Sequence, residues 1–188
     1  MYRRFHRFLV LAVLSFAAAA CVSVPEKPDA GDLAVAKRFL HNIDAGEWAL
    51  LSIRLKIDEE SKDQPGMAEL TRRAFADLTP GDIEDMISEI YARHVTREHL
   101  AELVQFTETK TGKRFFRIGF ISVINNTHQN MDEVMRQFNA DELGEILKFS
   151  QSEAAAELTR ELPAINEEVS NAARKMGEDR MREYIKKL

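Results

Sequence analysis

The chain has 188 residues, enough for one domain with a buried core, and carries 26 basic and 31 acidic side chains for a net charge of -5. This acidic balance argues against a nucleic-acid partner, because phosphate binding requires a basic face. The only cysteine is Cys21, which excludes an internal disulfide bond and leaves the core to be held by packing alone.

Residues 1–20 have the three parts of a secretory signal peptide. Three arginines within the first seven residues precede an apolar core at 8–16, and four alanines lie directly before Cys21. The apolar core is shorter than the roughly 20 residues that a membrane-spanning helix needs. We therefore expect 1–20 to be cleaved, which leaves 23 basic against 31 acidic residues and a net charge of about -8.

The box Ala18-Ala19-Ala20-Cys21 resembles the end of a bacterial lipoprotein signal, in which the cysteine is acylated and becomes the first mature residue. The resemblance implies a lipid bilayer partner through acylated Cys21, since several acyl chains together make anchoring stable. Val22 stands where an aspartate would favour the inner membrane, so the resemblance implies the outer one. The alternative is ordinary cleavage after Ala20, which would give a soluble periplasmic protein.

The segment 21–31 contains two prolines and a glycine and few residues to bury, so it predicts a tether to a helical domain at 32–188. In that domain apolar residues recur at helical spacing, and no stretch alternates as a strand does. We expect an all-α fold, a single helical bundle of about six to eight helices. Thr79 and Pro80 indicate one helix start, with a capping hydroxyl and a proline at the first helical position.

Two parts of the domain are similar to each other, because residues 95–121 realign on 138–164 at a shift of 43. Four pairs are identical, namely Leu100 and Leu143, Glu102 and Glu145, Phe106 and Phe149, and Arg117 and Arg160. The alignment predicts two repeated helix-turn-helix units, each a short helix, a tight turn and a longer helix. Neither unit can bury its apolar stripe alone, so the two should pack on each other.

Hydroxyl and amide side chains occupy matching positions in the two units. Thr96 and Asn139 are expected to cap the short helices, and Thr109 and Ser152 the longer ones. The longer helix of the first unit is expected to run from about Lys110 to Gln137. The apolar stripes on the two longer helices contain Phe116, Phe120, Val123, Met131, Val134 and Phe138 in the first, and Ile165, Val169, Ala172 and Met176 in the second.

The segment 94–113 resembles the signature of domain of unknown function 2059, a family of exported bacterial helical proteins. The matching residues are Phe106, Thr109, Gly112 and Lys113, in a helix that ends in phenylalanine before a turn with a hydroxyl residue. The resemblance implies a helical fold and an exported location. It implies no activity.

No constellation of residues predicts catalysis, a cofactor or a metal site. His94 and His99 flank Glu98, but two imidazoles on one helical face need a spacing of three or four residues. The uncharged polar run from Asn125 to Asn130 could bind a sugar or peptide, face solvent, or be satisfied inside the bundle. A basic C-terminal stretch, Arg174 to Lys187, complements the helix dipole or contacts an anionic polymer.

The sequence favours a non-enzymatic interaction or structural module of the bacterial cell envelope, with an envelope protein or the cell wall as partner. The alternative is a periplasmic carrier that holds an apolar ligand between Phe106, Phe120, Met131 and Phe149. A cavity lined by these residues would favour the carrier. A packed core with an exposed apolar patch would favour the interaction module.

Overall fold

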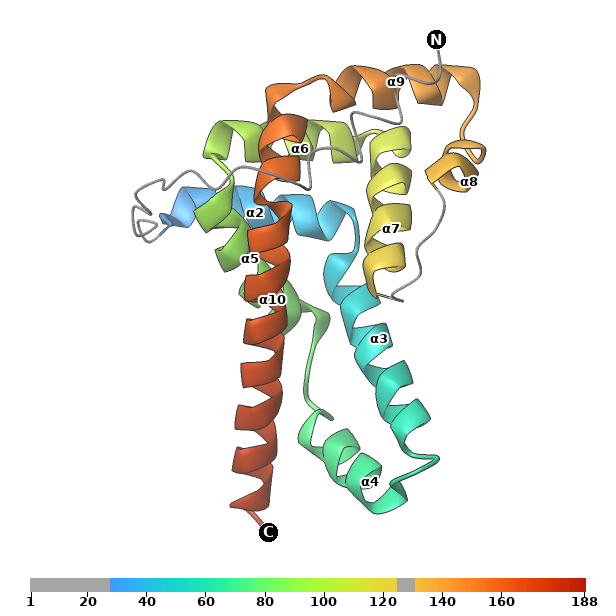
Figure 1. Cartoon of the computed structure of the whole chain (residues 1–188). Coiled ribbons are helices and arrows are strands. Elements are labelled where there is room, and N and C mark those ends of the chain that lie inside the picture. The colour runs from blue at the N-terminus through green and yellow to red at the C-terminus, as the bar shows by residue number, and fades with distance from the viewer. Residues whose placement is uncertain (1–27, 125–130) are drawn as a thin grey trace, which may run out of the picture.

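The computed structural model describes residues 28–124 and 131–188, and this part of the chain is all α-helical, as predicted (Figure 1). The signal peptide, Cys21 and the polar run Asn125 to Asn130 lie outside the described residues. Nine helices occur in the described part, one of them only five residues long. They are α2 (Ala30–Asn42), α3 (Ala45–Glu60), α4 (Pro65–Ala74), α5 (Pro80–His94), α6 (Arg97–Glu108), α7 (Lys110–Ile124), α8 (Met131–Met135), α9 (Ala140–Ser150) and α10 (Glu153–Ile185).

The first described helix starts at Ala30, slightly before the expected domain boundary at Asp32. Asp29 caps it, because its Oδ1 accepts hydrogen bonds from the amides of Gly31 (2.6 Å) and Asp32 (2.9 Å). The side chain of Asp32 accepts in return from the amide of Asp29, which completes a capping box. The last residues of the expected tether therefore belong to the folded domain.

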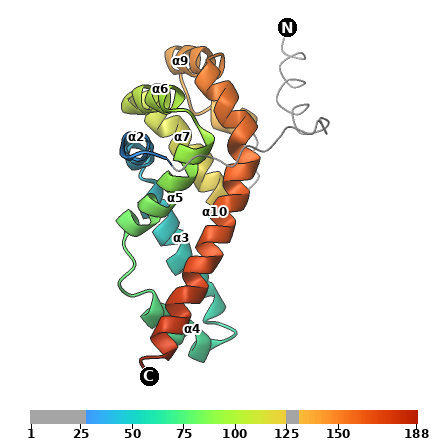
Figure 2. The same ribbon diagram turned by 90° about the vertical axis from the view of Figure 1, so that its left-hand side faces the viewer.

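The core lies where α2 packs on α5 and α6 and where α10 crosses α5 and α6 (Figure 2). These helices bury an apolar face and expose a polar one, as amphipathic helices of a bundle do. α10 extends along the whole molecule and also contacts α4 and α9. The largest apolar side chains exposed by 1% or less come from α2, α6 and α10 and are Phe39, Leu40, Leu100, Leu103 and Ile165.

The other end of the molecule is thinner. There α4 lies between the C-terminal halves of α3 and α10, in contact with both (Figure 1). Ile57 and Ala68 are buried in this part, and Arg180 of α10 pairs with Asp77 at 2.5 Å. The few buried side chains here contrast with the core at the crossing of α10, and they leave much of α3 open to solvent.

Each of the two similar segments forms a short helix followed by a longer one, α6 with α7 and α9 with α10. The hydroxyl of Thr109 accepts from the amide of Gly112 (2.9 Å), and that of Ser152 from the amide of Ala155 (3.2 Å), as expected of helix caps. Asn139 forms the expected capping box at the start of α9. Thr96 differs, because its hydroxyl donates to α10 and caps no amide of α6.

The expectation of one helix from Lys110 to Gln137 was wrong. α7 ends at Ile124, and α8 is a separate helix. The guanidinium of Arg114 donates to the carbonyl of Gln137 (2.8 Å), whereas 23 residues of continuous helix would separate these positions by about 35 Å. The physical reason for the reversal is apolar contact, since Val134 and Phe138 are buried in a small second core against the first turns of α7.

Candidate functional site

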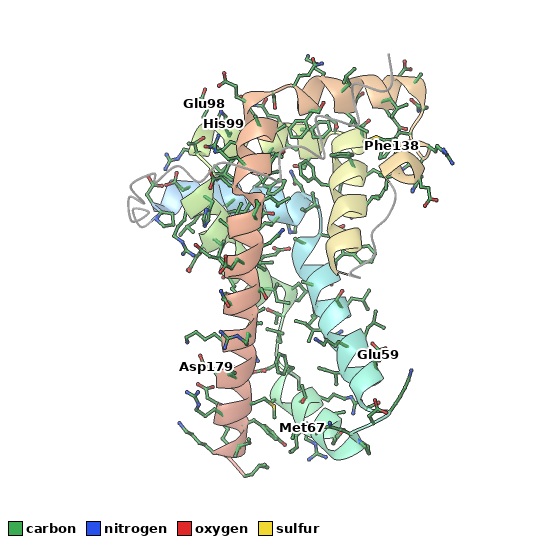
Figure 3. All side chains as sticks on the ribbon, in the orientation of Figure 1. Glu59, Met67, Glu98, His99, Phe138 and Asp179 are labelled. Atoms are coloured by element: carbon green, nitrogen blue, oxygen red, sulfur yellow. The ribbon has the colours of Figure 1, made fainter. Side chains whose placement is uncertain are left out.

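A group of paired ionisable side chains lies where α10 packs on α5 and α6. α5 ends at His94, Val95 is extended and buried, and Thr96 precedes the first turn of α6. This turn places the imidazoles of His94 and His99 against carboxylates of α10. Figure 3 shows His99 near the top of the molecule. We call the group the histidine–carboxylate cluster: His94, His99, Glu157, Glu161 and Glu168.

His94 contacts two carboxylates of α10. Its Nε2 lies 2.9 Å from Oε1 of Glu168, and its Nδ1 lies 3.5 Å from Oε2 of Glu161. Arg93 binds the other oxygen of Glu168 at 2.6 Å. The hydrogen bond from Arg93, together with that from His94, holds the pKa of Glu168 below its ordinary value, so Glu168 is an anion in this setting.

His99 is paired with Glu157, whose residue is only 9% exposed. Nδ1 of His99 lies 2.7 Å from Oε2 of Glu157, and the same oxygen accepts from the amide and the hydroxyl of Thr96, both at 3.0 Å. Burial acts to raise the pKa of Glu157, but these hydrogen bonds outweigh it and lower the pKa. The hydrogen bond to Glu157 in turn raises the pKa of His99.

The cluster has the chemistry of an ion-pair network between helices. Glu98, which the sequence analysis considered together with the two histidines, is exposed on α6 and does not join it (Figure 3). Over the described ranges 28–124 and 131–188, no three histidine, cysteine or acidic residues are arranged to hold a metal ion. The carboxylates already bind imidazole, guanidinium or backbone donors, so the arrangement holds α10 against α5 and α6.

Sequence reasoning missed the carboxylate half of this cluster. Glu157 and Glu161 lie one helical turn apart and Glu168 two turns further along α10, which is a helical spacing that the sequence does contain. Their partners, however, are 58 to 75 residues away along the chain. A stripe of glutamates usually faces solvent, and only the tertiary packing of α10 shows that this one does not.

The two helix-turn-helix units meet through phenylalanine rings. Phe106 of α6 and Phe149 of α9 stack with their centroids 4.1 Å apart and their planes 5° from parallel. Phe116 lies edge-on to both, at 6.1 Å and 5.8 Å. The other two residues expected to line a ligand cavity are Phe120 and Met131, and their side chains are not among those described. The described rings of Phe106, Phe116 and Phe149 are in direct contact with one another.

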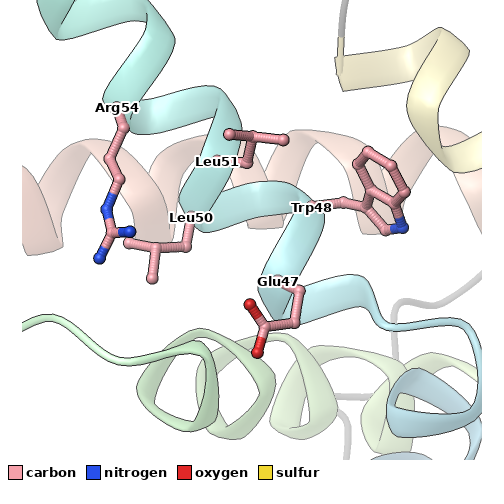
Figure 4. A pocket seen from close by; sticks show the side chains of 5 residues that line it. All are labelled: Glu47, Trp48, Leu50, Leu51 and Arg54. Atoms are coloured by element: carbon pink, nitrogen blue, oxygen red, sulfur yellow. The ribbon is translucent and has the colours of Figure 1, made fainter.

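An apolar face of α3 is exposed. Trp48, Leu51 and Leu55 share it at a spacing of three and four residues, with Leu51 44% and Leu55 56% exposed. Beside them lies a hollow of about 250 Å³ lined by Glu47, Trp48, Leu50, Leu51 and Arg54 (Figure 4). Trp48 is half-buried, and in Figure 4 it and Arg54 point to opposite sides of α3. A second hollow, of about 310 Å³, is lined by Asp63, Gln64, Met67 and Ala68.

Most cations of the basic C-terminal stretch are paired within α10 or with its neighbours. Arg174 binds Glu178 (3.0 Å), Lys175 binds Asp179 (2.7 Å), and Arg180 binds Asp77 of the loop before α5. These pairs neutralise the stretch locally. They disfavour a strongly basic surface for an anionic polymer at this end of α10.

Comparison of the chain with protein-family models, with curated proteins and with solved structures finds no match. The similarity to domain of unknown function 2059 and to lipoprotein signals therefore stays a prediction made from the residues. Among the helices of the described part, even the 33-residue α10 included, none combines the length and the apolar character needed to span a membrane.

Proposed function

We propose that the chain is an exported, lipid-anchored interaction module of the bacterial cell envelope, without catalytic activity. Cys21, acylated after removal of residues 1–20, would hold it at a lipid bilayer, in the outer membrane by resemblance to lipoprotein sorting. The helical domain would then bind an envelope protein or the cell wall. The observation that supports binding is the exposed apolar face of α3.

This apolar face is unusual because it lies on the outer side of a helix that is already packed on the domain. Leu50 and Ile57 lie on the other side of α3, which faces the domain, and are 5% and 6% exposed. The helix is therefore already packed on the domain. Leu51 and Leu55 are left over, next to the half-buried ring of Trp48. An aromatic ring beside aliphatic side chains is the composition found at the centre of protein interfaces.

The described geometry gives less support to a carrier. A ligand between the units would have to separate Phe106 from Phe149, which stack directly, and neither of the two hollows at α3 and at residues 63–68 is lined by these residues. The described geometry gives still less support to an enzyme. Its best candidate groups are His94 and His99, and both imidazoles are engaged in pairs with carboxylates.

Site-specific photo-crosslinking tests the proposal. A photoreactive side chain placed at Leu51 in cells is expected to give one discrete adduct, to be identified by mass spectrometry. The matched control is Leu147 on α9, which is 42% exposed against 44% for Leu51. We expect little or no adduct from position 147. Equal labelling from both positions, or no adduct from position 51, would contradict binding through α3.

A further inference from the structure

The histidine–carboxylate cluster connects helices that are distant in the sequence but share the core. Residues 93–99 form the end of α5, the turn and the start of α6, and every hydrogen-bonded or ion-paired side chain that they direct to α10 meets a glutamate there. Beneath these pairs lie Val95 and Ile165, which are 3% and 0% exposed. The polar contacts therefore lie at the edge of the apolar contact between α10 and the rest of the domain.

The charge of the cluster depends on two protons. Glu157, Glu161 and Glu168 supply three negative charges, and the exposed Glu153 lies 3.9 Å from His99. Arg93 and, on α10 itself, Arg160 are the neighbouring cations, the latter 3.5 Å from Glu157 and 2.9 Å from Glu161. With neutral imidazoles the carboxylates are in excess. With both imidazoles protonated the charges nearly balance.

Charged donors make the stronger contact. A hydrogen bond from a protonated imidazole to a carboxylate is roughly twice as strong as one between neutral partners. His94 and His99 are also sheltered, since their side chains are 12% and 19% exposed, which limits screening by water and salt. His41 on α2 provides the contrast, because its side chain is 80% exposed and lies 3.7 Å from Glu84.

We propose that the cluster is a pH-dependent fastening of α10: uptake of one proton by His99, beside the contacts of His94, holds α10 against α5 and α6, and loss of this proton loosens it. No other reactant takes part. The groups that face His99 are Glu153 and Glu157 from α10 and Glu102 from its own helix. Those that face His94 are Glu161 and Glu168.

Loosening would have a structural consequence in the core. The first half of α10 contributes Leu158 and Ile165, which pack with Leu100 and Val95. When α10 opens, these apolar side chains become accessible to a partner or to solvent. The raised pKa of His99 supports this direction, because it shows that the packed state favours the protonated imidazole.

Hydrogen–deuterium exchange on the whole chain tests the proposal, with rates corrected for intrinsic exchange. Between about pH 5.5 and about pH 8.5, we expect protection of residues 153–169 to fall several-fold more than that of residues 33–42 in α2. The double variant His94→Gln/His99→Gln keeps hydrogen-bonding capacity but cannot take up protons. Its α10 should exchange at a pH-independent rate, near that of the unmodified chain at high pH.

His41→Gln is the matched control and is expected to keep the full pH dependence of α10. An equal loss of protection in α10 and α2 of the unmodified chain would overturn the proposal. A pH dependence of α10 that survives in the double variant would also overturn it. Should the double variant fail to fold, NMR titration of the imidazole C–H resonances of the unmodified protein tests the proposal by giving the pKa of His99. A folded-state pKa of His99 at or below 6.5 would then refute the proposal.

Discussion

Phe106 and Phe149 occupy equivalent positions of the two helix-turn-helix units, 43 residues apart, and their rings stack directly on each other. Phe106, near the end of α6, thus contacts the equivalent residue Phe149, near the end of α9. Such a contact between equivalent residues relates the two units in space as well as in sequence. The pair is one contact between the units, beside the packing of α10 on α6 and of α7 on α9.

Truncating either ring should destabilise the domain through the loss of this contact. We expect Phe106→Ala and Phe149→Ala each to lower the free energy of unfolding by about 3 kcal/mol, the low end for phenylalanine because both rings are only half-buried. The double variant should cost less than the sum, with a coupling of about 1 kcal/mol. Urea unfolding of the four proteins measures this, and additive losses would contradict direct coupling.

Two glycines of α7 should respond in opposite ways to alanine. A Cβ at Gly112 would overlap the backbone carbonyl of Phe106, whereas one at the exposed Gly119 would meet nothing within 4 Å. We expect Gly112→Ala to destabilise by about 2 to 4 kcal/mol, because backbone must move. Gly119→Ala should stabilise by about 0.5 to 1 kcal/mol through helix propensity. Thermal unfolding compares them, and equal effects would show that α7 does not approach α6 so closely.

The pair of His99 and Glu157 should make stability depend on pH within a defined window. The folded-state pKa of His99 is raised, so its contribution is full below 6.5 and is lost as the pH rises through the higher folded value. That of Glu157 is lowered, so its contribution is present above 4.5 and is lost as the pH falls through the lower folded value. Stabilisation by the pair should therefore be greatest between 4.5 and 6.5.

Urea unfolding at several pH values checks this for His99→Gln. The variant should lose most stability relative to the unmodified protein inside the window and progressively less above it. Glu153→Gln removes the carboxylate that lies 3.9 Å from His99 and is 94% exposed, and it should change stability little at any pH. A loss in His99→Gln that is the same at all pH values would show that only packing matters.

Replacing Cys21 tests the proposed anchor. Because acyl chains on this sulfur would provide the membrane affinity, Cys21→Ala should move most of the protein from the membrane fraction to the soluble one. Val22→Asp should retain it in the membrane fraction but shift it toward the inner membrane on a density gradient. Mass spectrometry of the N-terminus of the unmodified protein gives a direct measure, and an unacylated Cys21 would contradict the anchor.

Most local signals were read correctly from the sequence, with the expected cap at Thr96 as the exception. The capping box of Thr79 and Asp82 at the start of α5, that of Asn139 and Glu142 at α9, and the hydroxyl cap of Ser152 each involve residues only three apart. Hydrogen bonds of this kind are decided within one turn of helix. They need no knowledge of the rest of the fold, which is why helix starts and the all-α class were predictable.

Long-range contacts were not predictable in the same way. The reversal between α7 and α8 depends on Arg114 reaching Gln137 and on burial of Phe138, and the helical spacing of apolar residues continues through this region regardless. The pairing of His99 with Glu157 depends on where α10 crosses α6. A periodic pattern shows which face of a helix is apolar and does not show which other helix covers it.

The position of α10 in the chain bears on the order of folding. Ile165 closes a core that is otherwise made by residues 36–104 and Leu158, so the ribosome must complete most of the polypeptide before the interior is sealed. Until then the emerging chain lacks α10, the helix that extends along the whole folded molecule. The export that we propose would gain from such a delay, because premature compaction would block the passage of an extended chain through a translocation channel.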